Sequence, residues 1–438
     1  MKIFRLPDIL KNIEFLKLWG NQVLLQVGFN MCNYTALLII AHRTHSVFSQ
    51  AQFYALLTLP AFFIGLVAGP LVDIVDRKRI MLVSNFLLAV LFLTYVFADG
   101  SILLIMLIAF LTSGVARFFI PSVAATIPLI VEKKTLNHAN AFFLFTLMGS
   151  VLLGYSITGP IIQTFGGLST RGEVIPFFLG STLLFISFIL IFTLKKINVE
   201  RPKIPDGTII KKILHLFWQT VGEIKANDKI SLPILLLVFV ELIVGLLSVA
   251  FLEYVRRFLH MPLTSVSLIL IAPLIVGLII GVLLLSQIER KYGRRLSIYL
   301  SCIGIGLLFL ILGIMPMLGE SWLSIIVFRI STIIAAFAFG VLVVVISVQA
   351  RTILQLHAKI QMQGRVFSFL DILISVSIPL PVLLLGFFAD RISILATLSF
   401  MGVAIILTTI FGNKIVIRKP RTPSLPSTDS VLGLRSGH

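Results

Sequence analysis

The sequence carries little charge for its length. Only 12% of its 438 residues are Asp, Glu, Lys or Arg, whereas a soluble domain carries about 25%. Its two cysteines, Cys32 and Cys302, both lie in apolar runs, which excludes a disulfide framework. The chain has no GxxxxGK(S/T) phosphate loop and no pattern typical of a nucleophile triad, which argues against ATP hydrolysis and related enzyme chemistry. His42 and His45 have no further ligand at metal spacing, so we expect neither a metal nor a cofactor.

Long apolar runs dominate what is present. Apolar residues make up 58% of the chain, and the mean hydropathy is +1.08. A helix needs roughly 20 mostly apolar residues to cross a bilayer. Twelve runs meet that need, at 16–40, 50–74, 80–98, 102–128, 138–165, 174–194, 231–255, 264–288, 296–316, 321–348, 364–389 and 391–416. The predicted fold class is therefore an all-α integral membrane protein with twelve transmembrane helices.

The net charge of +18 is distributed unevenly along the chain. If the N-terminus is cytoplasmic, 29 of the 36 Lys and Arg residues fall on that side, in segments such as 195–230, 289–295 and 349–363, and five fall on the other. This bias follows the positive-inside rule. It predicts a multi-pass protein of the plasma (inner) membrane with both termini in the cytoplasm. We expect membrane lipid as a partner of these cations, and no nucleic acid.

A polar segment divides the predicted spans into six and six. We expect an N-terminal six-helix bundle at 1–194, a cytoplasmic linker at 195–230, a C-terminal six-helix bundle at 231–417 and a disordered cytoplasmic tail at 418–438. Apolar residues recur every three or four positions over 208–224, which is typical of an amphipathic helix at a membrane surface. The loops DIVDRKR and ERKYGRR lie six spans apart and echo each other, which predicts two pseudo-symmetric bundles.

The stretch GPLVDIVDRKR at 69–79 carries a resemblance to a known family. It resembles the G-x-L-x-D-R-x-G-R-R loop of the major facilitator superfamily, with Ile74 where that pattern has Arg. Asp76 stands where the pattern has Gly, which looks like the drug and siderophore exporter branch, the relatives of macrolide and enterobactin exporters. Other stretches similar to this branch are FLKLWGNQ, PSVAATIPLIVEKKTLNHANA at 121–141, Gly159-Pro160 with Gly166-Gly167, and QGRVFS at 363–368. The resemblance covers residues 12–415 and implies the major facilitator fold.

The resemblance also implies a role for this charged loop. In the family its acid lies beside the cytoplasmic start of the eleventh helix, where N–H groups are unpaired and the helix dipole is positive. Such a contact would favour the state that is closed on the cytoplasmic side. The predicted conformational latch consists of Gly69, Asp73, Arg77, Lys78 and Arg79. The three cations have an alternative interpretation as orientation signals alone.

A stripe of carboxamides runs along the first predicted span. Gln22, Gln26, Asn30 and Asn33 fall on nearly the same helix face, and this face should point into the protein because amides are costly to expose to lipid. In this superfamily the first, fourth, seventh and tenth helices line a central cavity. The stripe is therefore a candidate wall of the substrate cavity, with interhelical hydrogen bonding as the alternative.

Four charged residues fall well inside predicted spans, where charge is costly and commonly functional. Glu241 lies near mid-membrane, and a carboxyl in such a place can exchange a proton near neutral pH. It is the proton-coupling candidate, with a structural pairing to Arg117 as the alternative. Arg117 and Arg329 are assigned to the substrate cavity, although Arg329 lies near the outer end and could equally extend to the interface. For Asp371 we expect a structural role.

Small residues recur along the fifth predicted span. Ser150, Gly154 and Thr158 are four residues apart and precede Gly159-Pro160, and this spacing lets helices approach closely. The Gly-Pro pair loosely resembles a motif of the family's antiporters, and ordinary helix packing explains it equally well.

Together these features predict a secondary active transporter and no enzyme. We expect alternating access between two bundles and proton-coupled export of an amphipathic small organic molecule. One alternative is a lysophospholipid or organic-anion carrier of the same fold, and another is a non-transporting membrane scaffold or sensor. The expected partners are membrane lipid, the small-molecule substrate and protons, and the protein is expected to be a monomer.

Overall fold

The computed structural model describes residues 8–65, 75–98, 101–132, 135–168, 171–195, 209–318, 322–357 and 360–418, and within these ranges the secondary structure is helical. Helices of the first half are α1 (Ile13–Thr44), α2 (Val47–Thr58), α4 (Arg77–Thr94), α5 (Ile102–Ile130), α6 (Leu136–Thr164) and α7 (Val174–Phe192). Those of the second half are α9 (Asp228–Phe258), α10 (Ala272–Ile314), α11 (Trp322–His357), α12 (Ile360–Ser377), α13 (Pro379–Arg391) and α14 (Ile394–Arg418).

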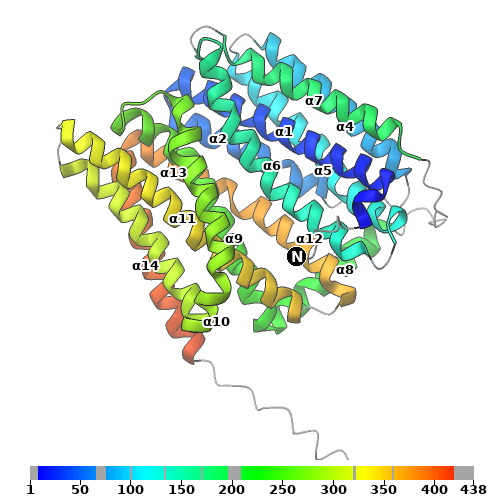
Figure 1. Cartoon of the computed structure of the whole chain (residues 1–438). Helices are drawn as coiled ribbons and strands as arrows, with labels where there is room; N and C mark the ends of the chain where they lie inside the picture. The colour runs from blue at the N-terminus through cyan, green and yellow to red at the C-terminus, as the bar shows by residue number, and fades with distance from the viewer. Residues whose placement is uncertain are drawn as a thin grey trace, which may run out of the picture.

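The helices gather into two bundles that follow the two halves of the chain. The blue to teal helices lie together on one side of Figure 1, and the green to red helices lie on the other. In the first bundle α1 packs against α6 and α7, and α4 packs against α5 and α7. In the second, α10 packs against α11 and α14, and α9 packs against α11 and α13. The prediction of an all-helical membrane fold in two bundles is confirmed.

Ten helical stretches among the described residues are long and apolar enough to cross a membrane. One of them, Leu263–Ile314, covers two of the predicted spans because α10 continues through the polar loop between them. The chain changes direction there at Gly293, whose φ of 73° is readily adopted by glycine alone. The length and apolarity of these helices make the protein a multi-pass membrane protein.

Polar side chains fix where several helices begin. Asn12 accepts a hydrogen bond from the Phe15 N–H at 3.1 Å and so caps α1. Asp76 accepts from the Lys78 N–H at 2.9 Å and caps α4. Such caps satisfy N–H groups that have no partner within the helix. Asp76 therefore has a local structural reason to stand where the family's loop pattern has glycine.

The first bundle is tied together by close backbone approach and by a buried polar cluster. A Cβ at Gly28 of α1 would lie 2.9 Å from the Gly180 carbonyl oxygen of α7. The Asn21 Oδ1 atom accepts from Asn85 Nδ2 and from Ser187 Oγ, both at 2.6 Å, and all three residues are fully buried. Small residues and interhelical hydrogen bonds of this kind replace the hydrophobic driving force that is missing between helices in lipid.

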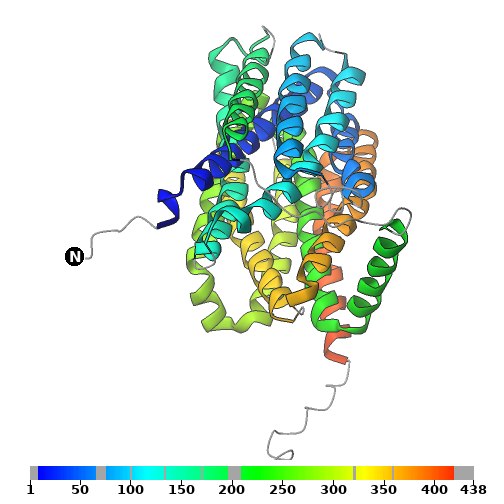
Figure 2. The ribbon, with the colours of Figure 1, turned by 90° about the vertical axis from the view of Figure 1, so that its right-hand side faces the viewer.

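Helix α8 (Ile209–Ala226) lies between the two halves of the chain, close to the predicted range 208–224. In Figure 2 it stands as a green helix at the edge of the molecule. It contacts α9 and α12, and its Ile224 joins a small apolar cluster with Leu354 and Val366 of the second bundle. The end of the molecule that carries α8 is called the α8 end below. The predicted tail, from residue 419 on, lies outside the described residues.

Candidate functional site

Charged residues from both bundles meet between them. Arg351 Nη2 of α11 lies 4.0 Å from Glu241 Oε1 of α9, and each side chain is about 40% exposed (41% and 40%). Asp371 of α12 is also exposed and interacts electrostatically with Arg351 and with Arg117 of α5. Glu241 in turn interacts with Asp371. We call Arg117, Glu241, Arg351 and Asp371 the central charge cluster.

The cluster links the two bundles electrostatically. Its members interact across the boundary, because Arg117 belongs to the first bundle and Asp371 to the second. All four lie within helices, and Arg117 and Glu241 are far from the ends of theirs. Water-accessible charge at this depth is stable when it is paired and faces a wet region. Two acids and two arginines also leave the cluster without formal net charge.

The helix that contains the predicted tenth span continues beyond that span. The predicted span ends at 348, which leaves Arg351 in the polar segment 349–363. Helix α11, however, continues to His357. Arg351 therefore projects from a helix toward Glu241. The polar residues that follow the apolar run belong to the same helix.

The carboxamide stripe of α1 is buried. The exposed fractions are 5% for Gln22, 8% for Gln26, 9% for Asn30 and 4% for Asn33. Asn30 Nδ2 donates to the Gln26 carbonyl oxygen at 2.7 Å, and Asn33 Nδ2 donates to that of Phe29 at 3.0 Å. Gln22 Oε1 and Asn33 Oδ1 accept no hydrogen bond from the described residues. The stripe thus points inward and keeps acceptors available.

Tyrosines lie next to the charge cluster, on the side away from α8. Tyr34 and Tyr155 stack with ring centroids 4.7 Å apart and an interplanar angle of 15°. A Cβ at Gly245 of α9, one turn beyond Glu241, would lie 3.0 Å from Tyr54 Cε1 of α2. Tyr54 is a near neighbour of Glu241 and of Tyr155. Offset aromatic faces next to charged groups suit a molecule with apolar and polar parts.

The bundles touch at the end opposite α8. A Cβ at Gly159 of α6 would contact the Thr264 carbonyl oxygen and lie 2.5 Å from Ser267 Oγ. Both of these residues belong to the second bundle and lie just before α10. Thr264 Oγ1 also donates to Gln163 Oε1 at 3.0 Å. At this end α6 therefore packs directly against residues 263–271 of the second bundle.

The loop cations bind helix ends in the first bundle. Arg77 Nη1 donates to the Ala125 carbonyl oxygen at 2.8 Å, and Lys78 Nζ donates to those of Phe192 at 2.9 Å and Leu194 at 2.5 Å. Cations at such carbonyls complement the negative end of a helix. Two further residues of the predicted latch, Gly69 and Asp73, lie outside the described residues.

Arg329 lies apart from the cluster. Its Nε and Nη2 atoms donate to the Leu259 carbonyl oxygen, at 3.2 and 2.9 Å, at the end of α9 opposite α8. This contact caps α9 and places Arg329 outside the central charge cluster.

Comparison with known proteins agrees with this architecture. A family model described as Major Facilitator Superfamily matches residues 18–380. Macrolide efflux protein A of Streptococcus pyogenes is 22% identical over 392 residues, which is 87% of this chain and 91% of that protein. Multidrug efflux pump Tap of Mycolicibacterium fortuitum is 23% identical over 369 residues, which is 80% and 83% of the two chains.

Solved structures share the fold at low sequence identity. A bacterial homologue of the iron transporter ferroportin in an inward-facing state has a TM-score of 0.70 at 14% identity, covering 92% of this chain and 98% of that one. The nucleoside transporter NupG has a TM-score of 0.67 at 12% identity, covering 93% of this chain and 100% of that one. With the family model matching most of its length, this chain belongs to the Major Facilitator Superfamily.

Proposed function

We propose that this protein is a secondary active transporter that exports an amphipathic organic molecule in exchange for protons. The observation that carries the proposal is the central charge cluster, in which Arg117 of the first bundle and Glu241 of the second lie well inside candidate membrane spans and interact with Asp371 and Arg351 near the ends of theirs. Ionisable groups at this depth are functional by default because they are costly to retain. The names of the relatives in Streptococcus pyogenes and Mycolicibacterium fortuitum, a macrolide and a multidrug efflux protein, support a drug-like cargo.

We assign the α8 end to the cytoplasm of a plasma (inner) membrane, with both chain termini on that side. The support is the distribution of basic residues, 28 of 36 of which fall on that side when Arg351 is counted with the charge cluster. The opposite end, where Gly159 meets Thr264, is then the outer end. In this orientation the bundles are closed outside, and the exposed charge cluster communicates with the cytoplasm. This arrangement corresponds to the inward-facing state of an alternating-access cycle.

The site has separate places for the two parts of an amphipathic cargo. Tyr155 is partly exposed and stacks on the buried ring of Tyr34, so it offers an apolar face toward the closed end. Glu241 lies one helical turn before Gly245, which faces Tyr54, and together with Arg351 it offers charge. Arg117 and Arg351 each interact with an acid, so an anionic cargo would have to displace a carboxylate. This favours the exporter over the organic-anion carrier.

Glu241 is the proposed proton-coupling residue. Its contact with Arg351, at 4.0 Å and with both side chains partly exposed, is at the long limit of an ion pair. A carboxylate held this loosely can exchange its cation partner for a proton or for a polar group of the cargo. Protonation from one side and cargo binding from the other would then compete for the same oxygen atoms, which is the requirement for exchange.

We also propose that Asp73 and its neighbours form the latch of the opposite, outward-facing state. Arg77 and Lys78 already bind the ends of α5 and α7, so they would hold the loop in place while Asp73 engages the start of α12.

The test is uptake into proteoliposomes with an imposed pH gradient. The probes are a radiolabelled macrolide and a fluorescent cationic dye, each with wild type and with Glu241→Gln. We expect the wild type to respond to the gradient and Glu241→Gln to fall to the level of empty vesicles, because the amide has no titrating proton. Exchange of labelled for unlabelled probe without a gradient should persist in the variant.

Glu223→Gln in α8 is the matched control, since it removes a carboxyl of the linker helix that contacts Gln219. It should respond to the gradient like the wild type. Equal gradient responses of Glu241→Gln and wild type would exclude Glu241 as the coupling residue. Absence of uptake with a broad panel of probes would favour the non-transporting scaffold.

A further inference from the structure

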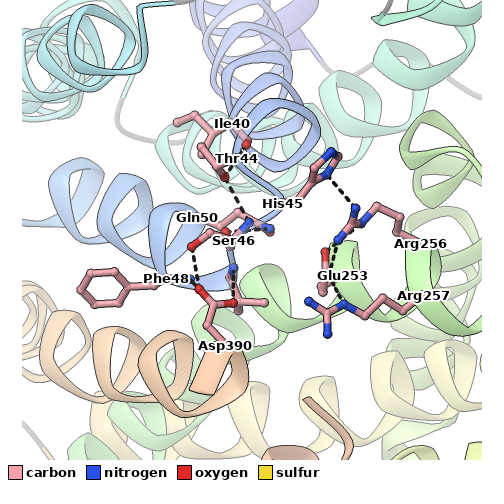
Figure 3. A network of polar contacts seen from close by, with 11 residues as sticks. Ile40, Thr44, His45, Ser46, Phe48, Gln50, Glu253, Arg256, Arg257 and Asp390 are labelled. Atoms are coloured by element: carbon pink, nitrogen blue, oxygen red, sulfur yellow. Dashed lines mark hydrogen bonds and ion pairs between the residues drawn. The ribbon is translucent and has the colours of Figure 1, made fainter. Parts of the chain in front are cut away.

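The N-terminus of α2 is capped by a residue of the other bundle. Asp390 lies at the end of α13, and its Oδ1 atom accepts from the Val47 N–H at 2.9 Å. Its Oδ2 atom accepts from the Phe48 N–H at 3.1 Å and from Ser46 Oγ at 2.6 Å (Figure 3). Capping groups usually come from the residue just before the helix. Here Ser46 caps α2 at the Ser49 N–H, 3.1 Å away, and Asp390 adds a charge from more than 340 residues along the chain.

The helices on which these groups lie are packed to bring them together. A Cβ at Gly386, one turn before Asp390, would lie 2.8 Å from Ala51 Cβ and 2.8 Å from Phe48 Cα. The Phe48 and Phe387 rings meet edge to face with centroids 6.4 Å apart. The crossing of α2 and α13 is therefore close, and it aims the carboxylate at the first N–H groups of α2.

A second contact holds the same turn of the first bundle. Arg256 Nη1 of α9 donates to His45 Nδ1 at 2.6 Å, just before α2 (Figure 3). Arg256 is itself fixed by Glu253, whose Oε2 atom accepts from its Nε at 3.0 Å and which also pairs with Arg257. Glu253 is 1% exposed. The α1–α2 turn is thus bound by α13 on one side and by α9 on the other.

We propose that Asp390 holds the outer end of the transporter closed, and that its bonds to Ser46, Val47 and Phe48 break each time the bundles open outward. The inference rests on the proposed alternating access and on the orientation given above. Its physical basis is that N–H groups at a helix start attract a carboxylate. The helix start belongs to the first bundle and the carboxylate to the second, so the contact must break when the bundles move apart at this end. His45 and Arg256 form the second arm of this outer latch.

The outer latch mirrors the one expected inside. Asp73 follows α2 in the chain and is expected over the start of α12, whereas Asp390 lies at the end of α13 and over the start of α2. The same pair of transmembrane segments would then carry an acid at each end, and the two acids would be engaged in opposite states. Loss of one should shift the population toward the state that the other stabilises.

The test is hydrogen–deuterium exchange of the full-length protein in lipid nanodiscs, without cargo. Asp390→Ala should raise exchange in peptides that cover 44–55 and 383–395 and lower it in peptides that cover 76–90 and 360–372. We expect the open population outside to rise roughly fivefold, the size of effect typical for loss of a helix cap. Asp390→Asn keeps one acceptor oxygen and should give a smaller shift in the same direction.

Asp228→Asn, in the first turn of α9 at the α8 end, is the matched control and should leave the outer peptides unchanged. A rise confined to the peptide that contains Val47, with no change at the α8 end, would mean that Asp390 caps α2 without gating and would overturn the inference. This readout needs no transported probe, so it separates failure of the latch from failure of the exporter proposal. Thermal unfolding of each variant checks that the fold is intact, and Ser46→Ala gives a milder variant of the same contact.

Discussion

Gly159→Leu is expected to abolish transport while leaving a folded protein in the membrane. In the structure any side chain at this position meets the Thr264 carbonyl oxygen and Ser267 of the opposite bundle. Backbone atoms cannot move aside as the end of a flexible side chain can. The bundles should therefore fail to close at the outer end, and the cycle should stop in the outward-facing state. Binding of a fluorescent cargo should persist, whereas uptake into proteoliposomes should be lost.

Gly149→Leu provides the control for this experiment. Gly149 lies on the same helix, ten residues earlier, and a Cβ there meets nothing within 4 Å. The same substitution should leave uptake near the wild-type rate. If Gly159→Leu transported normally, the contact between α6 and Thr264 would not be an obligatory part of the cycle. If both variants lost activity, the loss would come from placing a leucine anywhere in α6 and not from the contact at the outer end.

Gly277→Ala is expected to destabilise the fold itself. Its Cβ would collide with the Phe337 carbonyl oxygen of α11, while a Cβ at Gly340 of α11 would collide with the Leu274 carbonyl oxygen of α10. The two helices thus meet backbone to backbone at reciprocal glycines. Overpacking typically costs about 1–3 kcal/mol, and a contact with rigid backbone on both sides should lie at or above the upper value. The thermal unfolding midpoint in detergent measures the loss.

Gly304→Ala in the same helix is the control. It distinguishes a collision with backbone atoms from the loss of a glycine as such. Its Cβ would meet Leu342 Cδ1 at 2.9 Å, which is the end of a flexible side chain. Rotation of Leu342 can relieve this contact, so the midpoint should change little. Similar midpoints for Gly277→Ala and wild type would show that α10 and α11 can separate at no cost.

The sequence predicts the helices well because length and apolarity decide which segments cross a bilayer. It also identifies Glu241, Arg117 and Asp371 as exceptional, since charge inside an apolar run needs a reason. Arg351 was missed because it lies beyond the apolar run, where helix and loop have the same composition. Its partner Glu241 could have supplied the signal, because a mid-membrane acid requires a cation nearby.

Other features of the site depend on how helices cross and have no local signal. Tyr34 and Tyr155 are stacked at the heart of the protein, yet tyrosines in an apolar helix are equally common at lipid interfaces. Asp390 looks like an ordinary acid at the end of a span, and its role as a cap comes from Gly386 bringing α13 onto α2. Both features arise only when two distant segments are placed side by side.

The burial of both cysteines has a practical consequence. Cys32 is 0% exposed, and its Sγ donates to the Pro176 carbonyl oxygen at 3.7 Å, while Cys302 is 5% exposed. Thiol-reactive reagents need access to the sulfur atom, so neither native cysteine should react with a maleimide or a methanethiosulfonate. Reporter cysteines can therefore be introduced in pairs across the bundles of the otherwise unaltered protein, and distances between attached fluorophores or nitroxides can follow its motion directly.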